Sequence, residues 1–76
     1  MKQYTYRTII EPDEKGFHGF VPVLKGLHTH GDTLEETNEN LKDAIRCHIE
    51  GLIKDKITPP EEENVFEVIQ TITLHA

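Results

Sequence analysis

The sequence predicts a small α+β domain with the element order β-β-β-α-β, in which one helix packs on one face of an antiparallel sheet. Strand-type residues and turns fill the first 30 positions, one long helical pattern spans residues 34–53, and an alternating run covers residues 65–74. Several strands followed by a single long helix are typical of α+β folds. With a length of 76 residues, the whole chain (1–76) is expected to form one domain.

The first strand is expected over residues 3–10, which are rich in Tyr, Thr and Ile. Alternation places one set of side chains on a common face, namely Tyr4, Tyr6, Thr8 and Ile10. The polar residues 12–16 end in glycine and predict a turn.

The second strand is expected over residues 17–24, and it has apolar side chains on both faces. One face holds Phe17, Gly19, Val21 and Val23, and the other holds His18, Phe20, Pro22 and Leu24. One face is therefore expected to pack on the helix and the other on a second molecule. The candidate partner-binding residues are Phe17, Phe20, Pro22 and Leu24. The alternative is that Phe17 and Leu24 belong to the core, because small cores use aromatic residues.

A short third strand is expected over residues 27–30, followed by the turn residues Gly31 and Asp32. Gly31 is expected to be free to adopt a positive φ. Thr33 is a good helix N-cap, and Glu36 three residues later completes a T-x-x-E capping box. We assign Gly31, Asp32, Thr33 and Glu36 to folding, as turn and cap, rather than to binding.

The helix is expected over residues 34–53, with an apolar face at helical spacing. That face holds Leu34, Leu41, Ala44, Ile45, His48, Ile49, Leu52 and Ile53. Pro59 and Pro60 cannot continue a helix. The last strand, residues 65–74, is expected to return to the sheet, with Phe66, Val68, Gln70, Ile72 and Leu74 on one face.

The formal net charge of −6 argues against binding of nucleic acid through phosphate contacts and suits a basic protein partner. The single cysteine, Cys47, excludes an internal disulfide and fits a reducing compartment. There is no signal-peptide pattern and no apolar run long enough to cross a bilayer. The sequence therefore predicts a cytoplasmic protein with no membrane association.

Histidines and carboxylates raise the question of a metal site. His28 and His30 would lie on the same side of a strand, and His48 could add a ligand from the helix, but no known zinc spacing is present. Five carboxylates could hold Mg²⁺ as in two-metal nucleases, although each also fits a turn or cap: Asp13, Glu14, Asp32, Glu35 and Glu36. Cys47 next to His48 does not make a catalytic pair, because neighbours on a helix point apart. We expect no metal, no cofactor and no enzymatic activity, and a degenerate metal-dependent nuclease is the alternative.

Three runs of the chain together resemble the HicB antitoxins. These are the strand FHGFVPVLKGL (residues 17–27), the turn GDTLEE (31–36) and the helical NLKDAI (40–45), with the Pro-rich exit at Pro59 and Pro60. The resemblance implies a partial RNase H-like fold without nuclease activity. It also implies that the chain neutralises a small basic mRNA-cleaving toxin, HicA, by covering its active surface.

The chain departs from the family pattern in three ways. Many members continue into a helix-turn-helix or ribbon-helix-helix DNA-binding domain, whereas this chain stops at Ala76, so DNA binding is not expected to carry over. Thr37 replaces the usual Ala, and Leu27 replaces a common Cys. Solitary members without a toxin also exist, and a solitary regulatory protein remains an alternative. We expect at least a homodimer, because so small a domain buries little surface alone.

Overall fold

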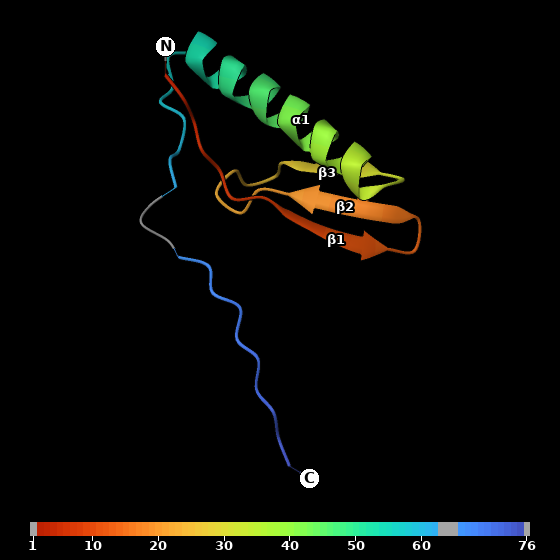
Figure 1. Cartoon of the computed structure of the whole chain (residues 1–76). Helices are drawn as coiled ribbons and strands as arrows, with labels where there is room; N and C mark the ends of the chain where they lie inside the picture. The colour runs from red at the N-terminus through yellow and green to blue at the C-terminus, as the bar shows by residue number, and fades with distance from the viewer. Residues whose placement is uncertain (1, 63–65, 76) are drawn as a thin grey trace.

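The computed structural model describes residues 2–62 and 66–75, and these form a three-stranded antiparallel sheet covered by one helix (Figure 1). The elements are β1 (Ile9–Asp13), β2 (Gly16–Phe20), β3 (His28–Gly31) and α1 (Leu34–Lys54). The strands lie in the order β1-β2-β3, and α1 packs on one face of the sheet. The predicted α+β class is confirmed.

The register of the strands determines which side chains face the helix. A Cβ atom built on Gly19 would lie 2.8 Å from Leu41 Cδ1, so this position of β2 points at α1. Its neighbours His18 and Phe20 therefore point to the opposite face. In β3, His30 pairs with His18 and His28 pairs with Phe20, which places these residues on that same face. We call the side of the sheet away from α1 the open face.

β1 is shifted along the chain relative to the predicted strand at residues 3–10. It begins at Ile9, because β2 ends at Phe20, which is the partner of Ile9, and provides no partner for earlier residues. The stretch before β1 instead contacts the segment after the helix. The Tyr6 hydroxyl donates to the Pro60 carbonyl at 2.6 Å, and the Arg7 N–H donates to Glu62 Oε1 at 3.1 Å.

β2 is shorter than the predicted strand at residues 17–24, because two consecutive turns follow it. The Leu24 N–H donates to the Val21 carbonyl at 3.0 Å, and the Leu27 N–H donates to the Leu24 carbonyl at 3.1 Å. These turns direct Leu24 inward, where it forms the core with Val21, Leu27 and Leu41. Tyr6, Ile10, Val23, Ala44 and Ile45 pack around this core.

α1 begins where the sequence predicts and ends one residue later than predicted. Thr33 Oγ1 accepts a hydrogen bond from the Glu36 N–H at 3.0 Å, which confirms the N-cap. At the other end, the Asp55 N–H bonds back to the Gly51 carbonyl, and Lys56 adopts a φ of 62°. That left-handed residue turns the chain out of the helix before Pro59. No helix among residues 2–62 and 66–75 is long and apolar enough to cross a membrane.

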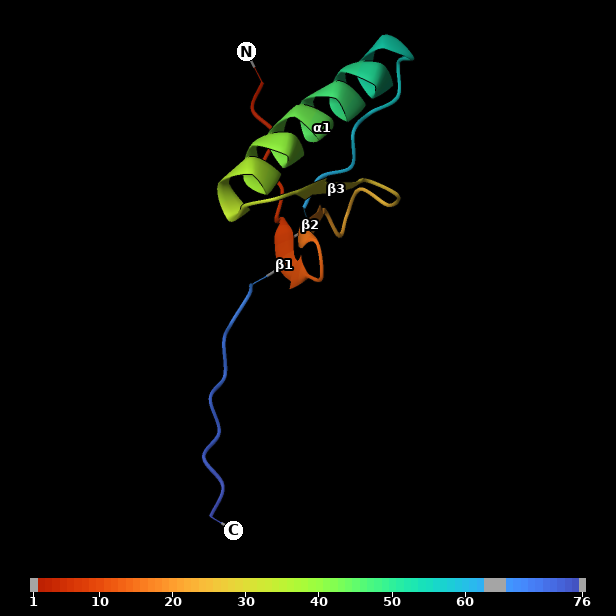
Figure 2. The same cartoon turned by 90° about the vertical axis from the view of Figure 1, so that its right-hand side faces the viewer.

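The predicted return of the last strand to the sheet is wrong for the residues that the structure describes. Residues 66–75 are extended but pair with no strand, and all of them are exposed; residue 65 of the predicted strand lies outside the described residues. Figures 1 and 2 both show this segment running away from the sheet and helix. The radius of gyration, 15.4 Å, accordingly exceeds the roughly 11 Å of a compact chain of this length. Alternation predicts an extended conformation, but it does not specify which sheet edge the segment joins.

Candidate partner-binding surface

The open face of the sheet presents a stack of three rings. The ring of His18 lies 5.7 Å from that of Phe20 and 5.0 Å from that of His28, centroid to centroid. The rings of Phe20 and His28 are 5.9 Å apart. Such stacks form because adjacent strands place directly paired side chains side by side. Together these residues provide a flat aromatic surface with polar edges.

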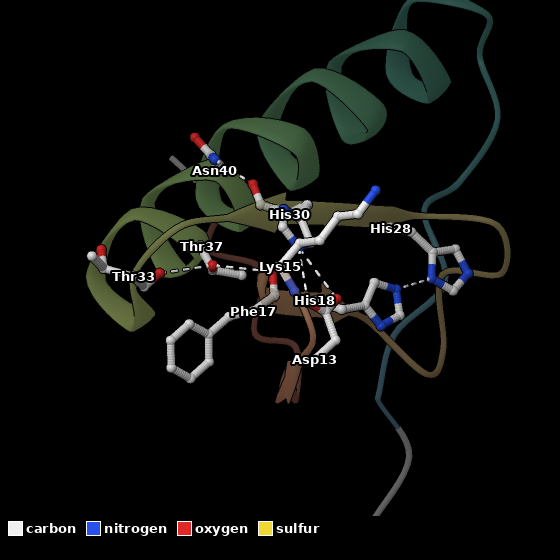
Figure 3. Close-up of polar contacts among 9 residues, drawn as sticks. All are labelled: Asp13, Lys15, Phe17, His18, His28, His30, Thr33, Thr37 and Asn40. Carbon is white, nitrogen blue, oxygen red and sulfur yellow. Dashed lines mark hydrogen bonds and ion pairs between the residues drawn. The ribbon is translucent and has the colours of Figure 1, made fainter.

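A hydrogen bond joins the two histidines of the stack. His18 Nε2 lies 2.8 Å from His28 Nδ1, as Figure 3 shows. One nitrogen donates and the other accepts, so at least one of the two rings must be neutral.

Asp13 and His30 form a second polar contact on the open face, near the β1–β2 turn (Figure 3). His30 Nε2 lies 3.2 Å from Asp13 Oδ2, and Asp13 Oδ1 accepts from the Lys15 N–H at 2.8 Å. The Lys15 N–H and then His30 hold the pKa of the Asp13 carboxyl below its usual value, because both stabilise the ionised form. These residues, together with Glu14, line a shallow depression.

The five carboxylates that the sequence suggested as metal ligands lie at one end of the domain. Asp13 is the last residue of β1 and Glu14 begins the turn to β2, while Asp32 lies just before α1 and Glu35 and Glu36 lie in its first turn. The two regions are adjacent, since a Cβ atom on Gly16 would lie 3.2 Å from the Asp32 Cα. We call these five residues the acidic end. Over residues 2–62 and 66–75, no group of three or more His, Cys, Asp or Glu side chains could hold a metal ion.

The histidines are arranged differently from the suggested trio. His28 and His30 share one face of β3. His48 of α1 lines a shallow depression together with His28 and Cys47, but His30 is not part of that lining. His18 of β2 joins His28 instead. Alternation in the second predicted strand placed His18 on the same face as Phe20, so alternation alone was enough to indicate that His18 lies beside Phe20.

The four candidate partner-binding residues do not lie together. Phe20 is on the open face, half-buried in the ring stack, and Pro22 is half-buried in the turn after β2. Phe17 is on the helix side, and its carbonyl lies 3.4 Å from the Thr37 hydroxyl. Leu24 is only 2% exposed and is part of the core. Of the four residues, Phe20 is the one that the structure presents on the open face.

The turn before α1 is built by close packing rather than by an unusual backbone. Gly31 is the last residue of β3, and its φ is not positive; the glycines with positive φ are Gly16 and Gly26. A Cβ atom on Gly31 would lie 2.7 Å from the Thr37 backbone nitrogen. Gly31 is therefore required for the close approach of β3 to α1, and the expected positive φ is wrong.

Thr37 and Asn40 attach α1 to the sheet, and neither was identified from the sequence (Figure 3). Thr37 is completely buried, and its hydroxyl donates to the Phe17 carbonyl of β2 at 3.4 Å as well as to the Thr33 carbonyl at 2.8 Å. The Asn40 side-chain amide donates to the His30 carbonyl at 2.8 Å. Polar residues in a helical pattern predict an exposed face, so only the structure reveals these contacts.

Comparisons with known proteins agree on one family. The profile of HicB-like antitoxins of bacterial toxin–antitoxin systems matches residues 6–75. A UPF0150 protein of Synechocystis sp. is 36% identical over 70 residues, which are 91% of this chain and 89% of the relative. A UPF0150 protein of Thermoplasma acidophilum is 39% identical over 72 residues, covering 93% and 97% of the two chains. No solved structure matches the chain significantly.

Proposed function

The chain belongs to the family of HicB-like antitoxins, and we propose that it neutralises a small basic HicA-type ribonuclease by binding it and covering its active surface. The antitoxin contributes no chemistry of its own in this proposal. The observation that supports it most directly is the acidic end next to the aromatic open face. A basic enzyme that binds RNA presents Lys and Arg side chains to the phosphates, and the carboxylates of an acidic surface can pair with those side chains instead.

The two parts of the surface have different roles in binding. Carboxylates at the acidic end attract a basic partner over a distance and raise the rate of encounter. The ring stack centred on Phe20 provides the apolar area that keeps the partner bound, because aromatic anchors dominate many interfaces. Asp13 belongs to both parts, since it contacts His30 at the edge of the open face.

Co-expression provides the test. The chain is produced together with the product of the neighbouring gene, provided that this gene encodes a small basic protein, and growth rescue and complex formation are measured. We expect rescue and a stable complex whose association rate falls as salt rises. Toxicity without rescue, or absence of a complex, would contradict neutralisation and would favour a solitary HicB-like binding protein.

A pair of variants tests the surface. Phe20→Asp is expected to weaken binding by about 30-fold or more, as the loss of an interface hot spot does. Ile53→Asp serves as the control, because Ile53 is exposed but lies in the last turn of α1, away from both the ring stack and the acidic end. Equal affinities of the two variants, with the fold of both intact by circular dichroism, would exclude the open face as the contact.

A further inference from the structure

Residues 66–75 have the side-chain pattern of a strand but no sheet around them. Five large apolar side chains occur in these ten residues, four of them in alternation, and all are exposed: Phe66 86%, Val68 66%, Ile69 91%, Ile72 75% and Leu74 85%. A contiguous apolar surface of this kind marks an interaction site rather than an ordinary solvated tail. The family profile also extends through these residues, so they belong to the common pattern.

The sheet has one edge that could accept such a strand. β1 pairs with β2 alone, so its outer N–H and C=O groups face solvent, except at Pro12, which has no N–H. At the opposite edge, the Asn40 amide already occupies the His30 carbonyl of β3. Next to the β1 edge, a groove runs between the stretch before β1 and α1, with Tyr6, Thr8 and Ile45 in its lining. An added strand could pair with β1 and lay alternate apolar side chains along this groove.

The chain's own segment leaves this edge uncovered. Contacts of Tyr6 with Pro60 and of Arg7 with Glu62 fix the exit of the chain beside the stretch before β1. Residues 66–75 then extend away from the domain (Figure 2). Every copy of the chain therefore has both an unpaired strand and an unpaired edge.

We propose that residues 66–75 of one chain add to the β1 edge of a second copy, and that the second copy returns the same contact. In a dimer with a two-fold axis, residues 66–75 of each copy pair with the β1 edge of the other copy, so no segment and no β1 edge is left unpaired. The ten residues have a single carboxylate, Glu67, although the whole chain has a net charge of −6. The segment therefore brings little negative charge to the accepting edge, where Glu11 and Asp13 of β1 are the carboxylates and Lys42 and Arg46 line the groove beside it.

The exchanged area is sufficient for a stable dimer. A large apolar side chain removes about 60–120 Å² from water when it is buried. Two segments with the four alternating side chains each, together with the surfaces that they cover, come to roughly 960–1,900 Å², which overlaps the range of specific stable interfaces.

Analytical ultracentrifugation of the full chain, without any toxin, tests the proposal. We expect a monomer–dimer equilibrium that Val68→Asp and Ile72→Asp each weaken by at least about tenfold, because a charge on an exchanged strand opposes edge pairing. Ile57→Asp is the matched control, since Ile57 is also apolar and exposed but lies outside the segment. Its dissociation constant is expected to stay within about threefold of the parent value.

NMR on a mixture of ¹³C-labelled and unlabelled chains tests the geometry. We expect intermolecular NOEs between the methyl groups of Val68 or Ile72 and those of Ile9 or Ile10. A monomer at NMR concentrations, a dimer that the two Asp variants leave unchanged, or NOEs confined to one chain would each overturn the proposal. Because no toxin is present, failure here leaves neutralisation untouched, and failure of growth rescue leaves the dimer untouched.

Discussion

At the scale of single residues, two glycines show why this sheet and helix lie so close together. Gly19 and Gly31 face α1 from neighbouring strands, where a side chain would collide with Leu41 or Thr37. The sequence identified Gly31 as important but for the wrong reason, because a glycine in a turn suggests a positive φ. A requirement for close approach depends on a partner distant in the chain, and one sequence cannot show it.

Gly31→Ala is expected to destabilise the domain by about 1–3 kcal/mol, since its Cβ would press on the Thr37 backbone. Gly51→Ala is the control. Gly51 lies within α1 with no atom within 4 Å of the added Cβ, so this change is expected to stabilise by about 0.5–1 kcal/mol. Urea denaturation followed by circular dichroism measures both, and changes of the same sign would contradict the packing described.

Asp13 is expected to give the stability a dependence on acid pH. Its folded-state pKa lies below the unfolded value of about 3.9, because the Lys15 N–H and His30 stabilise the carboxylate. The stabilising contribution is therefore present above about pH 4 and is lost as the pH falls through the lower folded-state pKa.

Melting temperatures of the parent and of Asp13→Asn, measured from neutral pH into the acid range, test this expectation. The difference between the two proteins should shrink as the pH falls. Asp32→Asn removes the same charge from the turn before α1 and controls for net charge. A difference that stays constant over the whole range would contradict the assigned role of Asp13.

At the scale of elements, the helix is the part that the sequence predicted best. Its start depends on chemistry within four residues, Thr33 to Glu36, and its length depends on a local period. The strands were predicted less well because their ends depend on partners. Residues 3–8 have strand composition, but β2 turns away after Phe20 and provides nothing to pair with.

The N-cap of α1 provides a test at this scale. Thr33→Ala is expected to lower the free energy of unfolding by about 0.5–2 kcal/mol, because the Glu36 N–H loses its acceptor. Thr33→Ser retains the hydroxyl and should remain near the parent value. If Ser and Ala destabilise equally in urea denaturation, the hydroxyl does not act as the cap.

The positions of the candidate surface residues also depend partly on the local sequence and partly on how the chain folds elsewhere. Alternation was enough to place His18 and Phe20 on one face, and both are in the ring stack. Leu24 was assigned to the same face, but the turns after β2 bring it into the core. Alternation holds only while the strand continues, and Pro22, which has no N–H to donate to a ladder, is the residue in this run that indicates an edge or the end of the strand.

At the scale of the whole molecule, the domain combines a small core with a projecting strand. Only five hydrophobic side chains in the described residues are buried: Val21, Leu24, Leu27, Leu41 and Ile49. So small a core gives modest stability by itself. The exposed residues 66–75 offer as many large apolar side chains again. Association through that segment would therefore contribute substantially to the stability of each copy.

The melting temperature should consequently rise with protein concentration. About a tenfold increase in concentration is expected to raise it by a few degrees, because dimerisation stabilises only the folded state. Scanning calorimetry at several concentrations measures the shift, and Val68→Asp should abolish it. A melting temperature independent of concentration in the parent protein would argue that each copy is stabilised alone.

The hydrogen bond from Asn40 to the His30 carbonyl has one further consequence. A sheet with two receptive edges can add chains at both sides without end and grow into a fibre. Here the Asn40 amide occupies an acceptor on the β3 edge, which leaves β1 as the receptive edge, and the reciprocal two-fold exchange closes the assembly at two copies. We expect Asn40→Ala to open the β3 edge to further strands, which would be seen as turbidity or fibrils rather than as a change in binding.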